Sequence, residues 1–551
     1  GWCRIRIQGE TGQEILVRHG EMLNLDGTLY TENLAAAVQE DRFILAGTGE
    51  EIFEPHFTYH GFRYVEITGL KDQPNADMVT GCVVCSDTRR TGTLECSNPM
   101  LNKLAENVLW TQRSNMHSVP TDCPQRDERM GWMGDAQVFG QSAIFNTDMA
   151  AFFTKWMQDI RDAQAKDGSF PDIAPHGYDP DVRFKNAPGW ADAGVFVPWR
   201  LYQNYGDTRV LKEHLEAAKR YIECIHRDNP DLLWKNNVGN NYGDWLNGDT
   251  IKAEGYPRRG GQLDKVIFAT AFFAYSTGLV ADMCEVLGEA DDAARYRDLA
   301  AKITAVFNKE FVNKDGKIKG DTQAGYAMAL HFNLLPEALQ SKAVAHMVEA
   351  IEKYDGRMST GFHSTYRMML ELSRWGHNDL AYQLVESTRF PSWGYSIEQG
   401  ATTMWERWDG YVKGRGFQDP GMNSFNHYAI GAVIEWMYRT IAGINPDEAN
   451  PDYSHFVIRP RPGGTLTWAK GSYDSIRGLI ESAWKLEGGN FTLDIQVPPN
   501  TEATVYVPAT AADNVRESGK PATDASGVTF VRMEKDAAVY RVKSGRYSFR
   551  S

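Results

Sequence analysis

Residues 118–135 read SVPTDCPQRDERMGWMGD and gather four acidic side chains, two arginines and an indole. Pro120 and Pro124 each remove a backbone donor and fix one φ angle, so the first half of this stretch is expected to be a shaped loop. After Gly134 the apolar residues recur at helical spacing, which predicts that the loop runs into a helix packed in a core. Such a charged, rigid loop beside Trp132 suits the binding of a polar, ring-shaped ligand. A structural cluster of ion pairs at a helix start is the alternative.

Length and composition limit the classes of function. A chain of 551 residues is too long for one ordinary hydrophobic core, so about two to four domains are expected. The formal charge of −14 disfavours nucleic acid or an anionic membrane as the main partner. We expect no apolar run long enough to span a bilayer. The 15 tryptophans and 24 tyrosines suit the stacking of sugar rings, although a large helical core uses the same residues.

Seven cysteines are scattered along the chain without the spacing of a disulfide framework. The odd count favours a reducing compartment, so a cytoplasmic location is the expectation. Cys82 and Cys85 have the spacing of metal ligands, but no second pair completes a zinc site, and no metal site is predicted. The chain opens at Gly1 in a strand-like pattern without an initiator Met, so we expect a fragment or a processed form.

Both ends of the chain have the alternation of β-strands. Residues 3–8, 14–19 and 63–68 alternate apolar and polar side chains and are separated by glycine-containing turns. The same pattern returns near the C-terminus. These patterns predict a β-sandwich over residues 1–92, incomplete at its N-terminus, and a second β-sandwich over residues 448–551.

The long central part, residues 93–447, is predicted to be helical. Apolar residues recur there near a 3.6-residue period, and few strand signals intervene. The first helix is expected to begin with Asn98 as its cap and Pro99 at its first position. Polar loops rich in glycine and aromatic residues separate the helices, and such loops on a rigid scaffold usually carry function.

Two acid-bearing loops offer the groups that glycoside hydrolysis needs. That reaction uses one carboxylic acid for the leaving oxygen and a second carboxylate for water or for the anomeric carbon. The loop of residues 118–135 offers the first acid. Glu406, between Trp405 and Trp408 in a loop bounded by glycines, offers the second. A surface salt bridge between Glu406 and Arg407 is an equally weighted alternative for that residue.

Three stretches resemble one enzyme family. Residues 122–136 (DCPQRDERMGWMGDA) are similar to the signature of the bacterial α-L-rhamnosidases of glycoside hydrolase family 78. Residues 402–409 (TTMWERWD) resemble a second motif of that family, and residues 57–66 (FTYHGFRYVE) resemble the sandwich that precedes its catalytic domain. The resemblance implies a multidomain, mainly α protein, in which an (α/α)6-barrel catalytic domain is flanked by N-terminal and C-terminal β-sandwich domains. It also implies an inverting glycosidase that releases terminal α-L-rhamnose from rhamnosides.

By matching position, the resemblance makes Glu128 the general acid and Glu406 the general base. An acid must stay protonated at the working pH, which requires burial or nearby anions. Asp127 is the rival acid, and Glu398 is a less favoured base. In an inverting enzyme the two carboxyl groups should lie about 6.5–9.5 Å apart, whereas a gap of about 5 Å indicates retention.

Polar neighbours are expected to bind the sugar. Asp122 and Asp135 would accept hydrogen bonds from ring hydroxyls, and Arg126 would donate to the sugar or clamp these carboxylates. Asp192 is predicted to be a further hydroxyl ligand, with a helix cap as the alternative. His427 matches a family histidine near the pocket, and a hydrogen-bonded core histidine is its alternative.

Three tryptophans are predicted to form the apolar part of the pocket. Trp132, Trp190 and Trp245 would stack on the sugar or line its 6-methyl group, which distinguishes a deoxyhexose from glucose. Core packing is the alternative for each of them.

The resemblance implies no required cofactor, and the common metal and phosphate motifs are missing from the sequence. It leaves room for a structural calcium ion in a sandwich domain. The expected partners are rhamnose-containing glycosides or oligosaccharides, and a homodimer is one assembly left open. Two other functions stay open: another (α/α)6-barrel carbohydrate enzyme, such as an inverting glucosidase or a lyase, and a sugar-binding protein without catalysis.

Overall fold

The structure is a computed structural model that describes residues 1–257 and 259–551. Contacts divide the chain into two compact units. The first unit comprises residues 1–87, 106–131 and 399–428, and the second comprises residues 88–105, 132–398 and 429–551. The predicted three-domain division, with boundaries after residues 92 and 447, stays a prediction.

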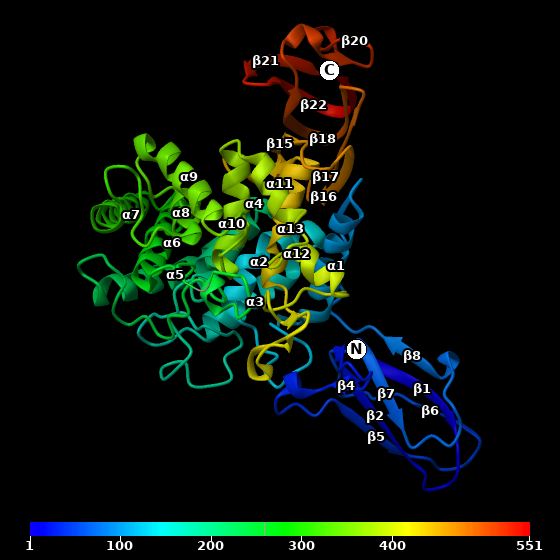
Figure 1. The fold of residues 1–551 in the computed structure, drawn as a ribbon. Coiled ribbons are helices and arrows are strands. Elements are labelled where there is room, and N and C mark those ends of the chain that lie inside the picture. The colour runs from blue at the N-terminus through cyan, green and yellow to red at the C-terminus, as the bar shows by residue number, and fades with distance from the viewer. Residues whose placement is uncertain (258) are drawn as a thin grey trace. The chain divides into compact units, whose positions relative to one another are not determined.

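The first unit contains an N-terminal pair of sheets (Figure 1). One sheet has the antiparallel order β6-β1-β8 and the other the antiparallel order β5-β2-β7. Alternate residues of β1 and β2 are buried, so Ile5, Ile7, Ile15 and Val17 contribute to one shared core. The predicted N-terminal sheet domain is therefore confirmed. Its strands are β1 Trp2–Gln8, β2 Glu14–Gly20, β3 Met22–Leu23, β4 Leu29–Tyr30, β5 Glu40–Ile44, β6 Glu50–Phe53, β7 Tyr64–Thr68 and β8 Val79–Cys82.

The same unit contains the loops that carry both predicted acids. Two short hairpins shape these loops: β10 Met116–His117 pairs with β11 Val119–Pro120, and β12 Tyr411–Val412 pairs with β13 Gly416–Phe417. Tyr30 of β4 packs with Trp405 and Phe425 in a buried aromatic cluster. Strand β4 and the loop that carries Glu406 therefore share a small aromatic core, which is separate from the core between the two sheets.

The helical region lies mainly in the second unit. Its first helix begins as predicted, because Asn98 Oδ1 accepts from the backbone N–H groups of Met100 (2.9 Å) and Leu101 (3.4 Å). The helices of the described residues are α1 Pro99–Asn115, α2 Met133–Asn146, α3 Ala150–Asp162, α4 Ala193–Tyr205, α5 Thr208–Asp228, α6 Lys265–Val286, α7 Ala290–Phe311, α8 Gln323–His331, α9 Glu337–Glu352, α10 Phe362–Arg374, α11 Asn378–Val385, α12 Trp393–Glu398 and α13 Val433–Trp436.

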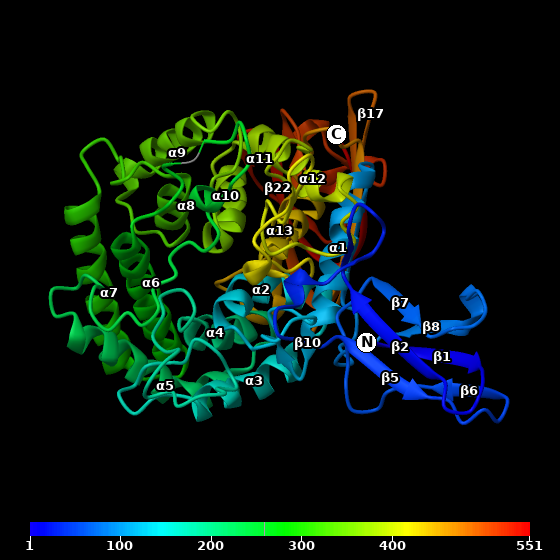
Figure 2. The ribbon, with the colours of Figure 1, turned by 60° about the horizontal axis from the view of Figure 1, so that its bottom comes forward.

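The helices of the second unit pack in a closed cycle. Helix α2 contacts α4, α4 contacts α6, α6 contacts α8, α8 contacts α10, α10 contacts α13, and α13 contacts α2. A second set, α3, α5, α7, α9 and α11, packs on members of this cycle. Helices α7 and α9 lie at the outer edge of the helical region in both views (Figures 1 and 2). The region therefore has an inner and an outer set of helices.

Helix α6 corrects one expectation. Its 22 residues are long and apolar enough to cross a membrane by composition, although no such run was expected. However, 78% of the apolar window is buried inside the protein, and α6 contacts α4, α5, α7 and α8. A helix that is apolar on all sides suits either a membrane or a buried core. Packing within the helical cycle accounts for this composition.

One segment of the part predicted to be helical, just before Ala429, contains no helix. Residues 423–428 are not helical, and the helical part starts with a 3₁₀ turn at Ala429. The backbone of the preceding segment is bonded elsewhere: Ser424 O accepts from the N–H of Glu406, and the N–H of Phe425 donates to Glu21 Oε2 (3.1 Å). These distant partners replace the bonds that a helix would have made.

A ten-stranded sheet closes the second unit, with the main order β20-β19-β22-β18-β17-β16-β9. The pairing of β18 with β22 is long and shifts at a bulge between Val497 and Glu502, and hydrogen bonds link all of these strands in one sheet. The predicted C-terminal sheet domain is therefore confirmed, and its arrangement as a sandwich stays a prediction. Strand β9 precedes the helices, so the predicted boundary after residue 92 falls inside a strand of this sheet. The strands are β9 Gly92–Cys96, β14 Ile444–Pro446, β15 His455–Ile458, β16 Trp468–Ser475, β17 Gly478–Glu487, β18 Asn490–Pro508, β19 Arg516–Glu517, β20 Lys520–Pro521, β21 Val528–Glu534 and β22 Ala537–Arg550.

Candidate active site

The charged loop after α1 is fixed by its own polar groups. Asp122 Oδ1 accepts from the N–H of Met130 (2.9 Å), and the N–H of Asp122 donates to Met130 O (3.0 Å). Arg129 has a φ of 47°, which turns the chain, and its Nη1 donates to Tyr59 O (2.9 Å). The prediction of a shaped loop, followed by a helix from Met133, is confirmed.

Arg126 is the centre of the candidate site. Its Nη2 lies 2.6 Å from Glu128 Oε2 and 3.4 Å from Asp122 Oδ2, and its Nη1 lies 3.0 Å from Glu406 Oε2. Arg126 and Glu406, which are 280 residues apart in the sequence, therefore meet in one buried cluster. Burial opposes the charge of Arg126, but these carboxylates raise its pKa above the usual value. A planar guanidinium with several fixed donors can hold several carboxylates at once.

Glu128 and Glu406 approach the same nitrogen atom. Glu128 Oε2 lies 2.6 Å and Glu406 Oε1 lies 3.5 Å from Nη2 of Arg126, so these two oxygens are no farther apart than the two distances combined. This limit concerns one pair of oxygens, whereas the range of about 6.5–9.5 Å for inverting pairs describes the separation of the two carboxyl groups. The predicted separation therefore stays a prediction.

Glu406 is buried and held as an anion. Its burial favours the neutral form, but the positive charge of Arg126 outweighs this effect, His427 and Arg407 add to it, and the pKa of Glu406 is lowered. The surface salt bridge with Arg407 that was the alternative is wrong. Arg407 Nε pairs with Asp409 Oδ1 at 3.3 Å, whereas Glu406 pairs with Arg126.

Asp122 and Glu128 form an acidic pair beside Arg126. Burial and, after it, the charge of Glu128 raise the pKa of Asp122 to about 7, although Arg126 opposes both effects. Glu128 keeps 30% of its side chain exposed, so it can reach a ligand. The rival acid Asp127 is engaged elsewhere, since its Oδ2 accepts from the N–H of Ala36 at 3.3 Å. One cation for three carboxylates favours the retention of a proton in this cluster.

The sandwich supplies supports for the acid-bearing loops that the sequence did not reveal. Arg63 Nη1 donates to Gly400 O at 2.6 Å, at the start of the loop that holds Glu406. Glu21, at the end of β2, accepts from the N–H of Phe425 at 3.1 Å. Arg63 lies in the motif of residues 57–66, but its partner Gly400 is 337 residues away in the sequence. Glu21 lies in no motif, and a single glutamate at a strand end gives no signal.

His427 lies within electrostatic range of both Glu406 and Arg126. Its N–H donates to Met404 O at 2.9 Å, which ties the two ends of the second acid-bearing loop together. Burial lowers the pKa of His427 to about 4, Glu406 opposes this effect, and Arg126 adds to it. The imidazole is therefore neutral near pH 7 and can serve as a hydrogen-bonding group.

The second unit holds the predicted tryptophans around one unpredicted tyrosine. The rings of Trp132, Trp190 and Trp245 lie 5.9, 4.6 and 5.6 Å from the ring of Tyr242. Trp190 is buried against Gly134, where an added Cβ would lie 2.5 Å from the indole, so the core-packing alternative describes Trp190. Trp132 and Trp245 are only half-buried. Tyr242 lies in one of the polar aromatic loops, but nothing in that loop distinguished it.

Two predicted acids of the second unit are buried. Asp192 accepts from the N–H of Gly189 (2.7 Å) and from Ser276 Oγ, so both of its oxygens bond to protein groups. Burial raises its pKa to about 6, and these hydrogen bonds oppose that effect. This arrangement favours a structural role for Asp192. Asp135 lies in the first turn of α2, where the helix dipole stabilises an anion.

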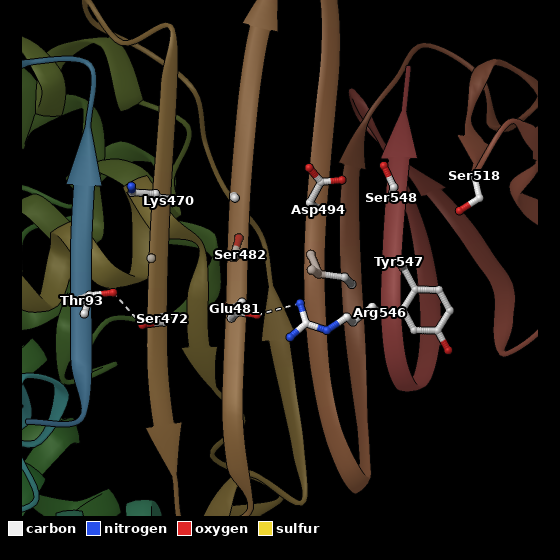
Figure 3. A pocket seen from close by; sticks show the side chains of 13 residues that line it. Thr93, Lys470, Ser472, Glu481, Ser482, Asp494, Ser518, Arg546, Tyr547 and Ser548 are labelled. Atoms are coloured by element: carbon white, nitrogen blue, oxygen red, sulfur yellow. Dashed lines mark hydrogen bonds and ion pairs between the residues drawn. The ribbon is translucent and has the colours of Figure 1, made fainter.

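The C-terminal sheet has a hollow of about 420 Å³ on one face (Figure 3). Polar and charged side chains line it: Thr93 bonds to Ser472 (2.7 Å), and Arg546 pairs with Glu481 (3.2 Å). None of the predicted site residues is among its lining residues. These contacts are those of an ordinary solvated sheet face.

Known proteins resemble the chain over its full length. The family model of the bacterial alpha-L-rhamnosidase 6 hairpin glycosidase domain matches residues 89–441. The chain belongs to the bacterial α-L-rhamnosidase family. Models of the concanavalin-like domain and the C-terminal domain of bacterial α-L-rhamnosidases match residues 1–85 and 443–522.

Individual α-L-rhamnosidases support this membership. One from Streptomyces avermitilis is 45% identical over 549 residues, and the match covers 100% of this chain and 50% of the relative. One from Formosa agariphila is 36% identical over 556 residues, and the match covers 99% of this chain and 58% of the relative. The crystal structure of the Streptomyces avermitilis α-L-rhamnosidase complexed with L-rhamnose has a TM-score of 0.93 at 45% identity and covers 100% of this chain and 50% of that chain. The structure of the α-L-rhamnosidase from Dictyoglumus thermophilum has a TM-score of 0.90 at 36% identity, and the match covers 100% of this chain and 60% of that chain. The chain thus spans about half the length of the curated relatives it matches.

Proposed function

We propose that the chain carries the catalytic machinery of an inverting α-L-rhamnosidase, which releases terminal α-L-rhamnose from rhamnosides. The observation that carries the proposal is the meeting of Glu128 and Glu406, from two distant motifs, at the guanidinium of Arg126. Membership of the family supports the reaction class. The relative that was crystallised with L-rhamnose supports the choice of sugar.

Glu128 is the proposed general acid. Its partly exposed carboxyl group can approach the glycosidic oxygen, and the cluster of three carboxylates around Arg126 favours the retention of a proton. In the proposed step the proton of Glu128 moves to the leaving oxygen as the bond from that oxygen to the anomeric carbon breaks.

Glu406 is the proposed general base. Arg126 keeps it ionised, so it can take a proton from a water molecule as that water attacks the anomeric carbon from the opposite face. The product is β-L-rhamnose, and Glu128 is left ionised and Glu406 protonated. Proton exchange with solvent restores both groups. Every step uses protein side chains and water.

Trp132 and Trp245 are the proposed stacking groups for the sugar. Both rings are half-buried, so one part of each packs in the protein while another part stays accessible. An indole face suits the C–H groups of a pyranose and the 6-methyl group of rhamnose. Asp135 is the proposed acceptor of a hydrogen bond from a ring hydroxyl of the sugar.

An (α/α)6 barrel is the proposed architecture of the helical region. The closed cycle α2-α4-α6-α8-α10-α13 supports an inner ring, and the helices packed on that cycle support an outer ring. The six-hairpin glycosidase model that matches residues 89–441 supports the same arrangement.

Hydrolysis of p-nitrophenyl α-L-rhamnopyranoside tests the proposed function. We expect release of p-nitrophenol, and proton NMR early in the reaction should show β-L-rhamnose before mutarotation produces the α anomer. If α-L-rhamnose appeared first, the enzyme would retain the anomeric configuration and the proposed inversion would be wrong. A folded chain that releases nothing between pH 4 and 9 would contradict the proposal, and binding of L-rhamnose without turnover would favour a sugar-binding protein.

A further inference from the structure

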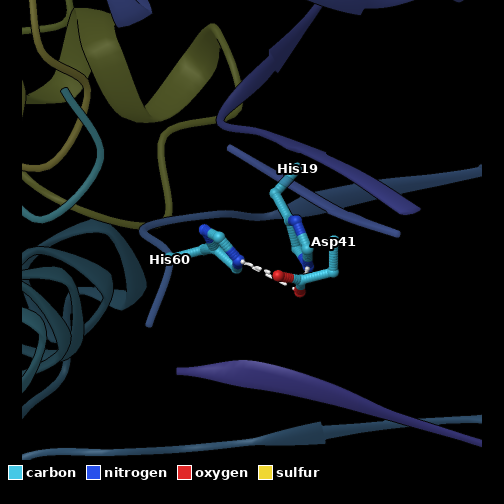
Figure 4. Close-up of side chains that lie close together, drawn as sticks. All are labelled: His19, Asp41 and His60. Atoms are coloured by element: carbon cyan, nitrogen blue, oxygen red, sulfur yellow. Dashed lines mark hydrogen bonds and ion pairs between the residues drawn. The ribbon is translucent and has the colours of Figure 1, made fainter. Parts of the chain in front are cut away.

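A buried cluster of two histidines and one carboxylate lies in the N-terminal sandwich, outside the candidate active site (Figure 4). His19 lies on β2, Asp41 lies on β5, and His60 lies in the segment that leads into β7. These strands are neighbours in the order β5-β2-β7. The side chains are 0%, 10% and 3% exposed. Three potential metal ligands therefore converge where three adjacent segments of one sheet meet.

The spacing of the ligand atoms suits a small cation. His60 Nε2 lies 3.0 Å from each oxygen of Asp41, a hydrogen bond that a zinc ion would replace by moving the ring hydrogen to Nδ1, and His19 Nε2 lies 4.0 Å from Asp41 Oδ2. All three ligand atoms lie within 4.8 Å of one another. Ligands on a tetrahedral zinc ion, with bonds of about 2.0–2.1 Å, are separated by about 3.3 Å. The rings of His19 and His60 are stacked, with centroids 4.1 Å apart and planes 23° apart, so a bound ion would require the two rings to turn toward it.

The backbone fixes the tautomer of His19. Its Nδ1 lies 3.1 Å from Gln39 O, and because a carbonyl oxygen only accepts, Nδ1 must carry the hydrogen. The neutral ring then directs the lone pair of Nε2 toward the cluster, and this buried atom has no hydrogen-bond partner. It faces Asp41 Oδ2, which is also an acceptor, at 4.0 Å. Two buried acceptors that face each other provide a position for a cation.

His19 makes the hydrogen bond to a neighbouring oxygen that metal-bound histidines usually make. One ring nitrogen donates to a backbone carbonyl, and the other is left for the ion. Two imidazoles and one carboxylate match the ligand preference of zinc, whereas calcium and magnesium prefer sets of oxygen ligands. The two imidazoles and the carboxylate therefore favour zinc over calcium or magnesium.

We propose that His19, Asp41 and His60 bind one zinc ion, with water completing its coordination. The ion would join β2, β5 and the segment before β7. That segment also contains Arg63, whose guanidinium bonds to Gly400 O. The proposed role is structural: zinc stabilises the part of the sandwich that supports the acid-bearing loops.

Zinc binding by the full chain tests the proposal. The protein is stripped with a chelator, incubated with zinc chloride, desalted and assayed for metal by mass spectrometry. We expect about one zinc ion per chain and a rise in the melting temperature on zinc addition. His19→Asn and Asp41→Asn should lose both effects while keeping a native far-ultraviolet circular dichroism spectrum. Wild-type protein that retains no zinc and shows no shift in melting temperature would overturn the proposal.

Two matched controls locate the ion. His56→Ala removes an exposed histidine of the same domain and should retain zinc. Cys123→Ser removes the sulfur of a second group of potential ligands, formed with Asp122 and Glu128, and should also retain zinc. Loss of zinc in Cys123→Ser but not in His19→Asn would place the ion at that second group and refute the proposal.

Cobalt provides a measurement on the wild-type protein that does not depend on whether the variants fold. Cobalt(II) bound to His19, Asp41 and His60 should show visible d–d bands without a thiolate-to-cobalt charge-transfer band in the near ultraviolet. A strong charge-transfer band would reveal a cysteine ligand and contradict the proposed site.

Discussion

At the scale of single residues, the proposed chemistry depends on Arg126 and the three carboxylates that it contacts. Glu406 pairs with its Nη1, while Glu128 and Asp122 pair with its Nη2. The guanidinium keeps the base ionised, and the excess of carboxylates over cations keeps a proton available. The different protonation states of the proposed acid and the proposed base thus have one cause, which is that three carboxylates share one guanidinium.

Glu128→Gln and Glu406→Gln should each lower kcat by about 10²–10⁴-fold, which is the usual contribution of a general acid or base. Each change removes a titrating group with almost no change in side-chain shape. Steady-state hydrolysis of p-nitrophenyl α-L-rhamnopyranoside measures the loss. Asp127→Asn and Glu398→Gln, which remove the rival acid and the rival base, should keep near-normal activity. Full activity of Glu406→Gln would move the base elsewhere.

The pH profile should follow from the same cluster. The pKa of Asp122 is raised to about 7, so the cluster loses its proton, and kcat/KM should fall, as the pH rises through about 7. The pKa of Glu406 is lowered, so the acidic limb should lie below the usual range of a glutamate. Asp122→Asn removes one negative charge and should move the basic limb to lower pH. An unchanged basic limb would show that Asp122 does not influence the catalytic proton.

Sequence motifs could predict the residues that perform the chemistry but not the residues that hold them. Glu128 and Glu406 each lie in a run of unusual composition, and the structure brings both to Arg126. Glu21 and Tyr242 were missed because a lone acid or a lone aromatic residue carries no pattern. Their importance depends on neighbours that are far away in the sequence.

At the scale of elements, loop positions depend on supports from the sandwich. Arg63 donates to Gly400 O, and Gly61 leaves no room for a side chain, since an added Cβ would lie 2.6 Å from Pro124. The first contact supports the loop of Glu406, and the second supports the loop of Glu128. Both supports come from the segment before β7.

Arg63→Ala should lower kcat/KM by about 10–100-fold, because a small displacement of Glu406 is enough to impair a positioned base. The loss should appear mainly in kcat, and Arg63→Lys should restore part of it. Arg42→Ala is a suitable control, since Arg42 is exposed and pairs with Glu14 on the surface at 2.9 Å. A loss confined to KM would argue against a positioning role for Arg63.

Asp244 shows how a neighbouring loop can support the start of a helix. Its carboxylate accepts from the N–H groups of Gly361 (2.7 Å), His363 (3.0 Å) and Ser364 (3.1 Å), and from Ser364 Oγ. These groups lie at the start of α10, where the first N–H groups have no partner within the helix.

Asp244→Ala should destabilise the fold by about 3 kcal/mol, because several buried donors would lose their acceptor. Differential scanning calorimetry should show a lower melting temperature. Asp231→Ala removes an exposed carboxylate that pairs with Lys235 and should leave the melting temperature nearly unchanged. Equal melting temperatures for the two variants would contradict this account.

Helices were easier to predict than the C-terminal sheet. Amphipathic periodicity is a local property, and α1 begins at Pro99 with Asn98 as its cap, as predicted. The continuous C-terminal sheet depends on pairing between Gly92–Cys96 and residues 469–473, which no local pattern records. The non-helical segment of residues 423–428 depends likewise on Glu21 and Glu406.

At the scale of the whole molecule, each compact unit is assembled from segments that are distant in sequence. In the second unit, Trp484 Nε1 donates to Ile441 O (2.7 Å), and Ser482 Oγ donates to Ala442 O (2.6 Å), so the sheet packs on the end of the helical region. The buried residues of β16, β17 and β18 complete this core. The sheet is therefore an integral part of the second unit.

A chain that ends at Ala442 should fail to fold. It would leave β9 without a partner strand and would expose the apolar end of the helical region. Soluble expression and the melting profile measure the outcome. A soluble, cooperatively melting protein of residues 1–442 would show that the sheet is dispensable.

Strand β9 has a consequence for biosynthesis. A ribosome that adds about 5–20 residues per second needs roughly 20–75 s to proceed from this strand to its partner in β16. Throughout that interval the nascent polypeptide carries a strand edge with unpaired amides, which is prone to pair with other emerging copies. Efficient production in a host should therefore depend on chaperone capacity and on slow, dilute synthesis.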